Sequence, residues 1–436
     1  MDILRGLLGL VFLTAVAFLI SSNRKAVRWQ VIAVGIGLQV VFGLAIFKVG
    51  FVHDGFEWLS SKFVAFLDFA RQGAMFLFGG LSVNSYNDPA AANHNLGFLF
   101  AFQALPTVIF FSAVTAGLYY LGILQKIVYG FAWVMARTMR LSGAESLSAA
   151  ANIFMGQTEA PLLVKPFIKN MTKSELFCLM TGGMATIAGS VLAVYVGMLG
   201  GADPAGQAKF ATYLLCASIM NAPAAIVMSK IIFPENEPEK IDSTLKVNKE
   251  QIGSNLVDAL ASGAGDGIKL ALNIGGMLLA FIAIILALNW GLNGIGDMLN
   301  VNAWIKESTA GAYNGLSLEY LLGQVFRVFA FFMGVDWSES LYVGSLLGKK
   351  MVLNEFLAYT DLAAFKSGGF LSEKSVLIST YALCGFANFS SIAIQIGGIG
   401  GMAENRKSDL SVLGMKAMLA AFLATMMTAT IAGAIF

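Results

Sequence analysis

Charged residues are scarce in this chain. Asp, Glu, Lys and Arg make up 12% of its 436 residues, whereas hydrophobic side chains make up 57%. Soluble domains carry roughly 25% charged residues, so this balance excludes an ordinary soluble protein and predicts an integral membrane protein. The 28 basic residues barely outnumber the 26 acidic ones, which argues against a nucleic acid as partner.

Histidine, cysteine and catalytic motifs are also rare or missing. Both histidines lie outside the long apolar runs, and the three cysteines lie inside such runs without metal-binding spacing. HExxH, GxSxG and Walker motifs are absent, so we do not expect an enzyme. Residues 263–266 (GAGD) are similar to the GxGD signature of intramembrane aspartyl proteases, but no apolar run offers a second aspartate. An intramembrane protease therefore remains only as an alternative from a different class of function.

Long apolar runs are abundant. A span takes about 20 apolar residues, and these runs are long enough: 3–20, 31–49, 98–121, 176–199, 211–233, 268–288, 376–399 and 410–436. Basic residues follow the first, third, fifth and seventh runs. The positive-inside rule therefore places those loops in the cytoplasm and both termini outside. Between the runs, we expect an amphipathic helix at 51–81, a charged linker at 234–251 and a glycine-rich outer loop at 291–317.

Residues 144–167 are apolar at both ends and polar at the centre. Neither arm can cross a bilayer, and Pro161 suits the first turn of a new helix. The stretch predicts a re-entrant hairpin, and residues 338–359 predict a second one, because both share a Glu-Ser-Leu start and a later glutamate. Three spans separate the hairpins, so the second enters from the opposite face. Such an inverted repeat is typical of secondary transporters, although a re-entrant-loop channel is a further alternative.

The hairpins and the helices after them carry polar groups at membrane depth. A carboxylate there, such as Glu159 or Glu355, costs on the order of 2.5 to 3.5 kcal/mol unless it is paired or hydrated. The functional interpretation is binding of a polar solute or a cation, and the structural alternative is capping of a half-helix. Neutral groups share these positions and predict either a polar ligand or interhelical bonding: Gln157, Thr158, Asn388, Ser390 and Ser391.

Other residues of the same segments have weaker patterns. Asn152, Thr186 and the carbonyls of Met155 and Ile187 would suit a small cation, but hydroxyl groups also bond back to their own helix. Phe386 could stack on a flat ring. We expect Lys349 and Lys350 to extend to the lipid headgroups.

Three motifs resemble the signatures of the concentrative nucleoside transporter family, bacterial sodium-coupled type: 156–161 (GQTEAP), 354–359 (NEFLAY) and 384–391 (CGFANFSS). The resemblance covers essentially the whole chain. It implies homotrimers of all-α polytopic protomers, with about eight transmembrane helices and two re-entrant hairpins in an inverted repeat. In such an elevator-type transporter, a transport domain moves past a trimerisation scaffold and imports nucleosides with sodium or, in some members, protons.

The resemblance also implies residue roles. Residues facing the nucleobase would be Gln157, Thr158, Glu159 and Val191. Residues holding the ribose would be Glu355, Asn388 and Ser391, with Phe386 nearby. Sodium ligands would be the side chains of Asn152 and Thr186 and the carbonyls of Met155 and Ile187. The pair Gly156 and Gln157 resembles members that accept uridine and cytidine, often with adenosine.

The patterns and the resemblance together imply one domain plan and one function. The predicted parts are peripheral N-terminal helices (1–95), a scaffold span with an interfacial helix (96–142), the first transport half (143–233), a linker with a scaffold span (234–317), and an interfacial helix with the second transport half (318–436). We expect sodium-coupled import of uridine, cytidine and adenosine across the inner membrane, with no organic cofactor. A proton-coupled symporter is the alternative within transport.

Overall fold

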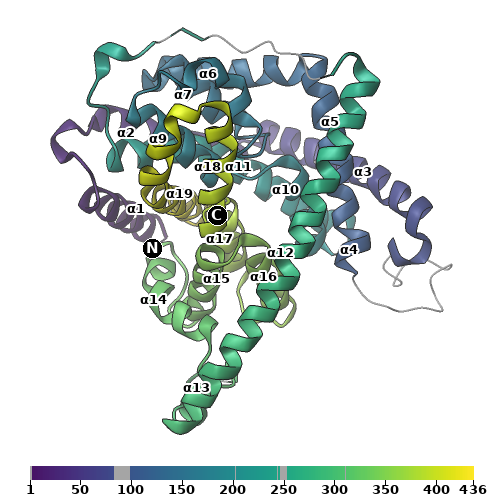
Figure 1. The fold of residues 1–436 in the computed structure, drawn as a ribbon. Helices are drawn as coiled ribbons and strands as arrows, with labels where there is room; N and C mark the ends of the chain where they lie inside the picture. The colour runs from purple at the N-terminus through teal and green to yellow at the C-terminus, as the bar shows by residue number, and fades with distance from the viewer. Residues whose placement is uncertain (1, 83–98, 202, 243, 246–252, 310) are drawn as a thin grey trace.

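The computed structural model describes residues 2–82, 99–201, 203–242, 244–245, 253–309 and 311–436, and the regular elements in these ranges are all helical (Figure 1). The predicted boundary between residues 95 and 96, and the start of the run 98–121, lie outside the described residues. Five helices precede the repeats: α1 (Asp2–Leu19), α2 (Trp29–Lys48), α3 (Gly50–Phe78), α4 (Phe100–Gln103) and α5 (Leu105–Tyr120). Helix α3 confirms the helix expected at 51–81.

The predicted repeat is present as two series of helices in the same order. The first contains α6 (Ile123–Met139), α7 (Gly143–Ala151), η4 (Ala160–Val164), α8 (Lys165–Ile168), α9 (Lys173–Ala185), α10 (Gly189–Gly200) and α11 (Pro204–Ile232). The second contains α14 (Leu318–Phe332), α15 (Ser340–Val352), α16 (Glu355–Ser367), α17 (Glu373–Leu383), α18 (Phe389–Met402) and α19 (Lys407–Ile435). In each series a helical hairpin is followed by a broken helix and then by one continuous helix of 29 residues.

Local sequence explains where these helices begin. Ser142 and Glu145 form a capping box at the start of α7, and Thr172 and Glu175 form one at the start of α9. Side-chain oxygens likewise accept backbone N–H groups at the starts of α16, α17 and α18, from Asn354, Ser372 and Asn388. Each cap satisfies a donor that has no partner within its own helix.

The repeats are joined by α12 (Leu256–Met298), a 43-residue helix about 65 Å long at 1.5 Å per residue (Figure 1). The short helix α13 (Asn302–Ser308) follows it. The prediction of a loop at 291–317 is therefore wrong over much of that range. Asn302 orders the turn, because its side chain donates to Asp297 of α12 (2.7 Å) and accepts from the N–H of Leu316 (2.8 Å). Each glycine inside a helix lowers the stability of the helix by only about 1 kcal/mol, and the hydrogen bonds of Asn302 offset this loss.

Seven helical segments in the described residues are long and apolar enough to cross a membrane. The remaining predicted span, 376–399, is present as the two half-helices α17 and α18, which are too short to be counted singly. The chain is therefore a multi-pass membrane protein, with the number of spans that the apolar runs predicted.

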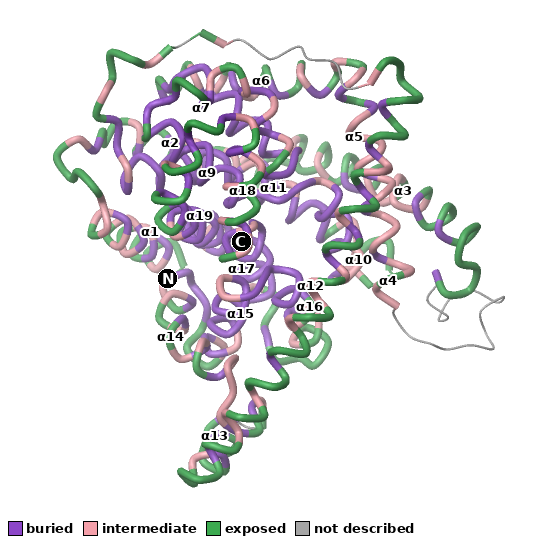
Figure 2. Tube along the Cα trace, in the orientation of Figure 1, coloured by how far each residue is buried: buried purple, intermediate pink, exposed green. Residues whose placement is uncertain are grey.

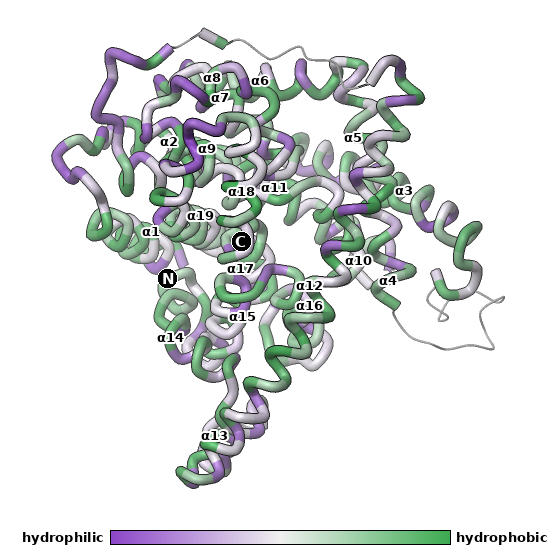
Figure 3. The backbone as a smooth tube through the Cα atoms, viewed as in Figure 1, coloured by the Kyte–Doolittle hydropathy of each residue, from purple (hydrophilic) through white to green (hydrophobic). Residues whose placement is uncertain are grey.

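Burial separates the spans into two groups. In the segment Lys173–Gly200, 94% of the most apolar window is buried within the protomer, against 17% in α12. Helices α9, α11, α17 and α19 pack together at the centre, where Figure 2 shows continuous burial, whereas α3 and α12 are mostly exposed. Figure 3 shows long hydrophobic stretches along α12, whereas hydrophobic and hydrophilic segments alternate along α3. The outer face of α12 therefore suits lipid or neighbouring copies rather than water.

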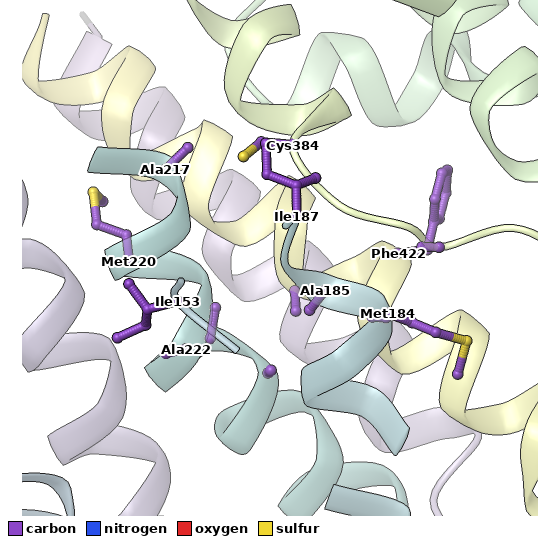
Figure 4. Close-up of a cluster of buried hydrophobic side chains, with 14 of the residues drawn as sticks. Ile153, Met184, Ala185, Ile187, Ala217, Met220, Ala222, Cys384 and Phe422 are labelled. Atoms are coloured by element: carbon purple, nitrogen blue, oxygen red, sulfur yellow. The ribbon is translucent and has the colours of Figure 1, made fainter. Parts of the chain in front are cut away.

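The two broken helices contact each other at their breaks. One break lies at 186–188 between α9 and α10, and the other at 384–388 between α17 and α18. A β-carbon at Gly385 would lie 2.7 Å from the carbonyl oxygen of Ala185, closer than packed atoms allow, so this crossing needs glycine. Figure 4 shows Ile187 and Cys384 together at the crossing, above Ala185.

Candidate functional site

The tip of hairpin 1 is held by the helices behind it. Helix α7 ends at Ala151, and the chain then turns through residues 152–159 before η4. Two carbonyls released by the turn have new donors: the Ser218 hydroxyl of α11 bonds the carbonyl of Ile153 (2.7 Å), and the N–H of Gly189 bonds that of Phe154 (3.2 Å). Buried backbone groups need such partners where water is excluded, so the tip has a defined shape.

The break after α17 is stabilised in the same way. Three side chains donate to carbonyls in its last turn and just beyond: Tyr359 to Thr380 (2.8 Å), Lys350 to Ala382 (2.8 Å) and Asn221 to Cys384 (2.6 Å). A cation at this position also complements the negative end of the helix dipole.

The expectation that Lys349 and Lys350 extend to the headgroups is therefore wrong. Lys350 is fully buried and also donates to the Thr425 hydroxyl (3.0 Å). Lys349 is buried between two carboxylates, Asp361 at 2.5 Å and Glu319 at 3.2 Å. Paired acceptors within reach keep both ammonium groups inside the protein.

Glu355 is the centre of the polar site. It is the first residue of α16 and only 3% exposed. One carboxylate oxygen accepts from the Tyr195 hydroxyl of α10 (3.0 Å), and the other accepts from the Asn388 amide (3.0 Å). Stacking of Tyr195 on Tyr359, with ring centroids 4.1 Å apart, fixes the direction of the phenol. A buried carboxylate held on both sides is a rigid acceptor for hydroxyl groups.

Hydrogen bonds continue from Glu355 to hairpin 1. The Asn388 carbonyl oxygen accepts from the Ser391 N–H (2.9 Å) and the Ser390 hydroxyl (2.8 Å). The Ser391 hydroxyl then accepts from the amide of Gln157 (3.1 Å), at the tip of hairpin 1. We call this series the polar chain; its members are Tyr195, Glu355, Asn388, Ser391 and Gln157. It joins the tip of hairpin 1, at Gln157, to the tip of hairpin 2, at Glu355.

Four further predicted residues lie around the polar chain without a direct hydrogen bond to it. Thr158 is exposed, and its methyl group lies 3.3 Å from where a β-carbon of Gly398 would be. The half-buried Glu159 accepts from the N–H of Gly156 at 3.4 Å, within its own tip. Val191 is buried on α10 one turn before Tyr195, and Phe386 is half-buried in the break before α18.

The predicted cation residues gather where hairpin 1 meets the break after α9. The Asn152 amide nitrogen lies 3.3 Å from where a β-carbon of Gly182 would be, and the Thr186 hydroxyl donates to the Gly182 carbonyl (2.9 Å). The Asn152 amide also donates to the carbonyl of Ser148. Both side chains therefore donate a hydrogen bond to a carbonyl four residues earlier in the chain. Among the described residues, the buried Asn152 carbonyl oxygen has no hydrogen-bond partner. Met155, three residues after Asn152, and Ile187, directly after Thr186, are also buried. The free acceptor of Asn152 fits a small hard cation.

Sequence reasoning missed Tyr195 and Gln395. Tyr195 lies four residues after Val191, on the same face of α10. Gln395 is fully buried on α18 and donates to Gln157 (3.3 Å). The available signal was a polar group inside an apolar span, which marks a functional position by default.

Fold and site together define a class of protein. Two hairpins from inverted halves meet two broken helices, and a buried polar chain connects them. This is the architecture of a secondary transporter. Asp266, the aspartate of the GAGD sequence, lies on an exposed face of α12 beside Lys269 (3.4 Å), which gives a protease active site no support.

Comparisons with known proteins identify the family. Residues 8–81 match the model of the Na+ dependent nucleoside transporter N-terminus, residues 101–202 a nucleoside recognition model, and residues 213–433 the Na+ dependent nucleoside transporter C-terminus. The chain is 42% identical to a transporter of Haemophilus influenzae, over 99% of this chain and 98% of the other. It is 38% identical to mouse sodium/nucleoside cotransporter 1, over 98% of this chain and 63% of the other. The chain belongs to the sodium-dependent, concentrative nucleoside transporter family.

Solved structures agree with this assignment. CNTnw in an inward-facing, substrate-bound state superposes with a TM-score of 0.88 at 38% identity, covering 100% of this chain and 99% of that one. A CNTnw variant in an outward-facing state gives 0.88 at 37% identity, covering 100% and 98%. The fold is that of an elevator-type transporter, and the family consists of membrane transporters rather than enzymes.

Proposed function

We propose that this chain imports uridine, cytidine and adenosine by coupling their movement to a sodium gradient, as a homotrimer in the inner membrane with both termini outside. The observation that carries the proposal is the polar chain between the two hairpin tips. Ribose offers two adjacent hydroxyl groups, which a fixed carboxylate and amide can bind together. A site built this way strongly rejects analogues that lack a hydroxyl, because its buried groups are then left unpaired.

Each end of the polar chain has its own role. Glu355, Asn388 and Ser391 hold the ribose, with Phe386 beside it. Gln157, Thr158, Glu159 and Val191 face the nucleobase. When a nucleoside binds, its polar groups replace hydrogen bonds that these side chains otherwise make to one another, such as the bond between Gln157 and Ser391.

Sodium would be held by the side-chain oxygens of Asn152 and Thr186 and by the carbonyls of Met155 and Ile187. The free, buried acceptor of Asn152 supports this assignment. When bound, the ion supplies a positive charge that helps fix hairpin 1 against α9, so its gradient can drive movement of the loaded transport domain.

The function is tested with purified protein in liposomes. We expect labelled uridine to accumulate above its external concentration when an inward sodium gradient is imposed, and no accumulation with a pH gradient alone. Accumulation driven by the pH gradient would show proton coupling through Glu159 or Glu355. Equilibration without accumulation would indicate a channel, and absence of any nucleoside uptake would refute the proposal.

A threonine-to-valine exchange tests the cation residues. Thr186→Val keeps the shape of the side chain but removes its oxygen, so we expect the sodium concentration for half-maximal uptake to rise about tenfold, the effect of losing roughly 1.4 kcal/mol. Thr181→Val is the matched control, because Thr181 is also buried on α9 and bonds back to its helix at 2.8 Å. An unchanged sodium titration in Thr186→Val would contradict the assignment.

A further inference from the structure

Gln395 lies next to the nucleobase end of the polar chain and is not one of the residues that bind the nucleoside or sodium in the proposed function. It is on α18, one turn after Ser391, and its side chain is fully buried. Its amide nitrogen bonds both the backbone carbonyl of Met180 on α9 (3.1 Å) and the side-chain oxygen of Gln157 (3.3 Å). Its own carbonyl oxygen is buried and has no hydrogen-bond partner in the part of the chain that the structure describes.

These contacts fix which way each amide points. The Met180 carbonyl can only accept, so the end of Gln395 that faces it must be the NH₂ group. That group can only donate, so the end of Gln157 facing it must be the carbonyl oxygen. The NH₂ group of Gln157 is therefore turned toward Ser391, at 3.1 Å. The orientation of Gln157 is thus anchored to the backbone of α9.

The two glutamines are also placed by packing. A β-carbon at Gly183 would lie 2.5 Å from the amide nitrogen of Gln395 and 3.1 Å from the β-carbon of Gln157. Gly183 thus gives both side chains room against α9, one turn from the Met180 carbonyl. A larger residue at position 183 would push the Gln395 amide away from Gln157, so the contact between the glutamines depends on this glycine.

We propose that Gln395 is a positioning residue that sets the hydrogen-bonding sense of Gln157 and thereby the preference between nucleobases. The inference depends on the proposed function, in which Gln157 faces the base. With its oxygen engaged by Gln395, Gln157 presents an N–H donor to the ligand. Uracil offers a carbonyl acceptor where cytosine carries an amino donor. This orientation therefore favours uridine over cytidine at the Gln157 contact.

Two substitutions separate this role from simple packing. Gln395→Met keeps length and volume but removes the donor, so the Gln157 amide can rotate and the ratio of uridine to cytidine affinity should fall by roughly 2- to 10-fold. Gln395→Glu places an oxygen where the NH₂ group stood. A neutral glutamate donates its proton to the Met180 carbonyl and accepts from Gln157, which turns the Gln157 NH₂ group toward it and should move the ratio further toward cytidine. The readout is competition by each nucleoside against sodium-driven uptake of labelled adenosine.

The matched control is Gln39→Met. Gln39 is also a fully buried glutamine that donates to a backbone carbonyl, that of Gly35 (3.2 Å), but it lies on α2, away from the polar chain. We expect this variant to keep the wild-type ratio. A wild-type ratio in Gln395→Met with uptake retained would overturn the role of Gln395 and leave the proposed function intact. Absence of nucleoside uptake by the wild-type protein would instead overturn the function, and the inference with it.

Discussion

Glu355→Gln is expected to abolish uridine uptake while the proposed trimer still forms. Glu355 accepts from Tyr195 and from Asn388, each at 3.0 Å. Glutamine has the same shape, but its NH₂ group must face one of these two donors, and it carries no charge to bind the ribose hydroxyls. Hydrogen bonds to a charged group contribute about 1.5–3 kcal/mol each, so the loss of two corresponds to at least a 100-fold fall in uptake. Radiolabelled uridine uptake in liposomes measures it.

The control is a glutamate that bonds the N-cap residue of a helix away from the polar chain. Glu339 accepts from the N–H and hydroxyl of Ser372 at the start of α17 (3.2 and 2.9 Å). Glu339→Gln should retain most of the uptake. Wild-type uptake in Glu355→Gln would remove the ribose role, and loss of the trimer on size-exclusion chromatography would mean that the residue is structural.

The second large effect is expected at the base of hairpin 1, where Lys230→Met should strongly destabilise the protein. Lys230 forms an ion pair with Glu145 and donates to the Ser174 hydroxyl (2.9 Å). Glu145 and Lys230 are only 2% and 7% exposed. Without its partner the buried Glu145 carboxylate is uncompensated, which costs about 3–5 kcal/mol. Thermal unfolding in detergent should therefore begin several degrees lower.

A double substitution distinguishes the charge from the packing. Glu145→Gln combined with Lys230→Met removes both charges and should be more stable than Lys230→Met alone, because no unpaired charge is left. Lys209→Met is the surface control, since Lys209 pairs with the exposed Glu373 at 3.2 Å, and such pairs contribute about 1 kcal/mol or less. Wild-type stability of Lys230→Met would contradict the importance of the buried pair.

The topology could be predicted from the sequence because its signals for membrane spans and hairpins are strong. Apolar runs of about 20 residues and two similar polar interruptions predicted the spans, the hairpins and their inverted relation. The motifs around Gln157, Glu355 and Asn388 predicted which residues the fold brings together, and these residues form three hydrogen bonds of the polar chain: Gln157 with Ser391, Asn388 with Glu355, and Ser391 with Asn388.

Other features depend on three-dimensional contacts that a linear pattern does not contain. Lys350 has the sequence pattern of a lipid-facing lysine, but the carbonyl of Ala382 and the hydroxyl of Thr425 keep it inside. The glycines near residue 291 suggest a loop, yet the bonds of Asn302 extend an ordered helix to Met298. Tyr195 and Gln395 were missed because neither lies in one of the three motifs: each is a single polar residue within an apolar helix, and its partner lies more than 150 residues away in the chain.

The close crossing at Gly385 connects the proposed sodium site to the proposed nucleoside site. The Ala185 carbonyl that it touches is one residue before Thr186, and Gly385 is three residues before Asn388. The crossing is tight, so a displacement of either backbone displaces the other, and in the proposed function the ion and the nucleoside do not bind independently. Thermodynamic reciprocity then requires that any gain in ion affinity caused by the nucleoside equals the gain in nucleoside affinity caused by the ion.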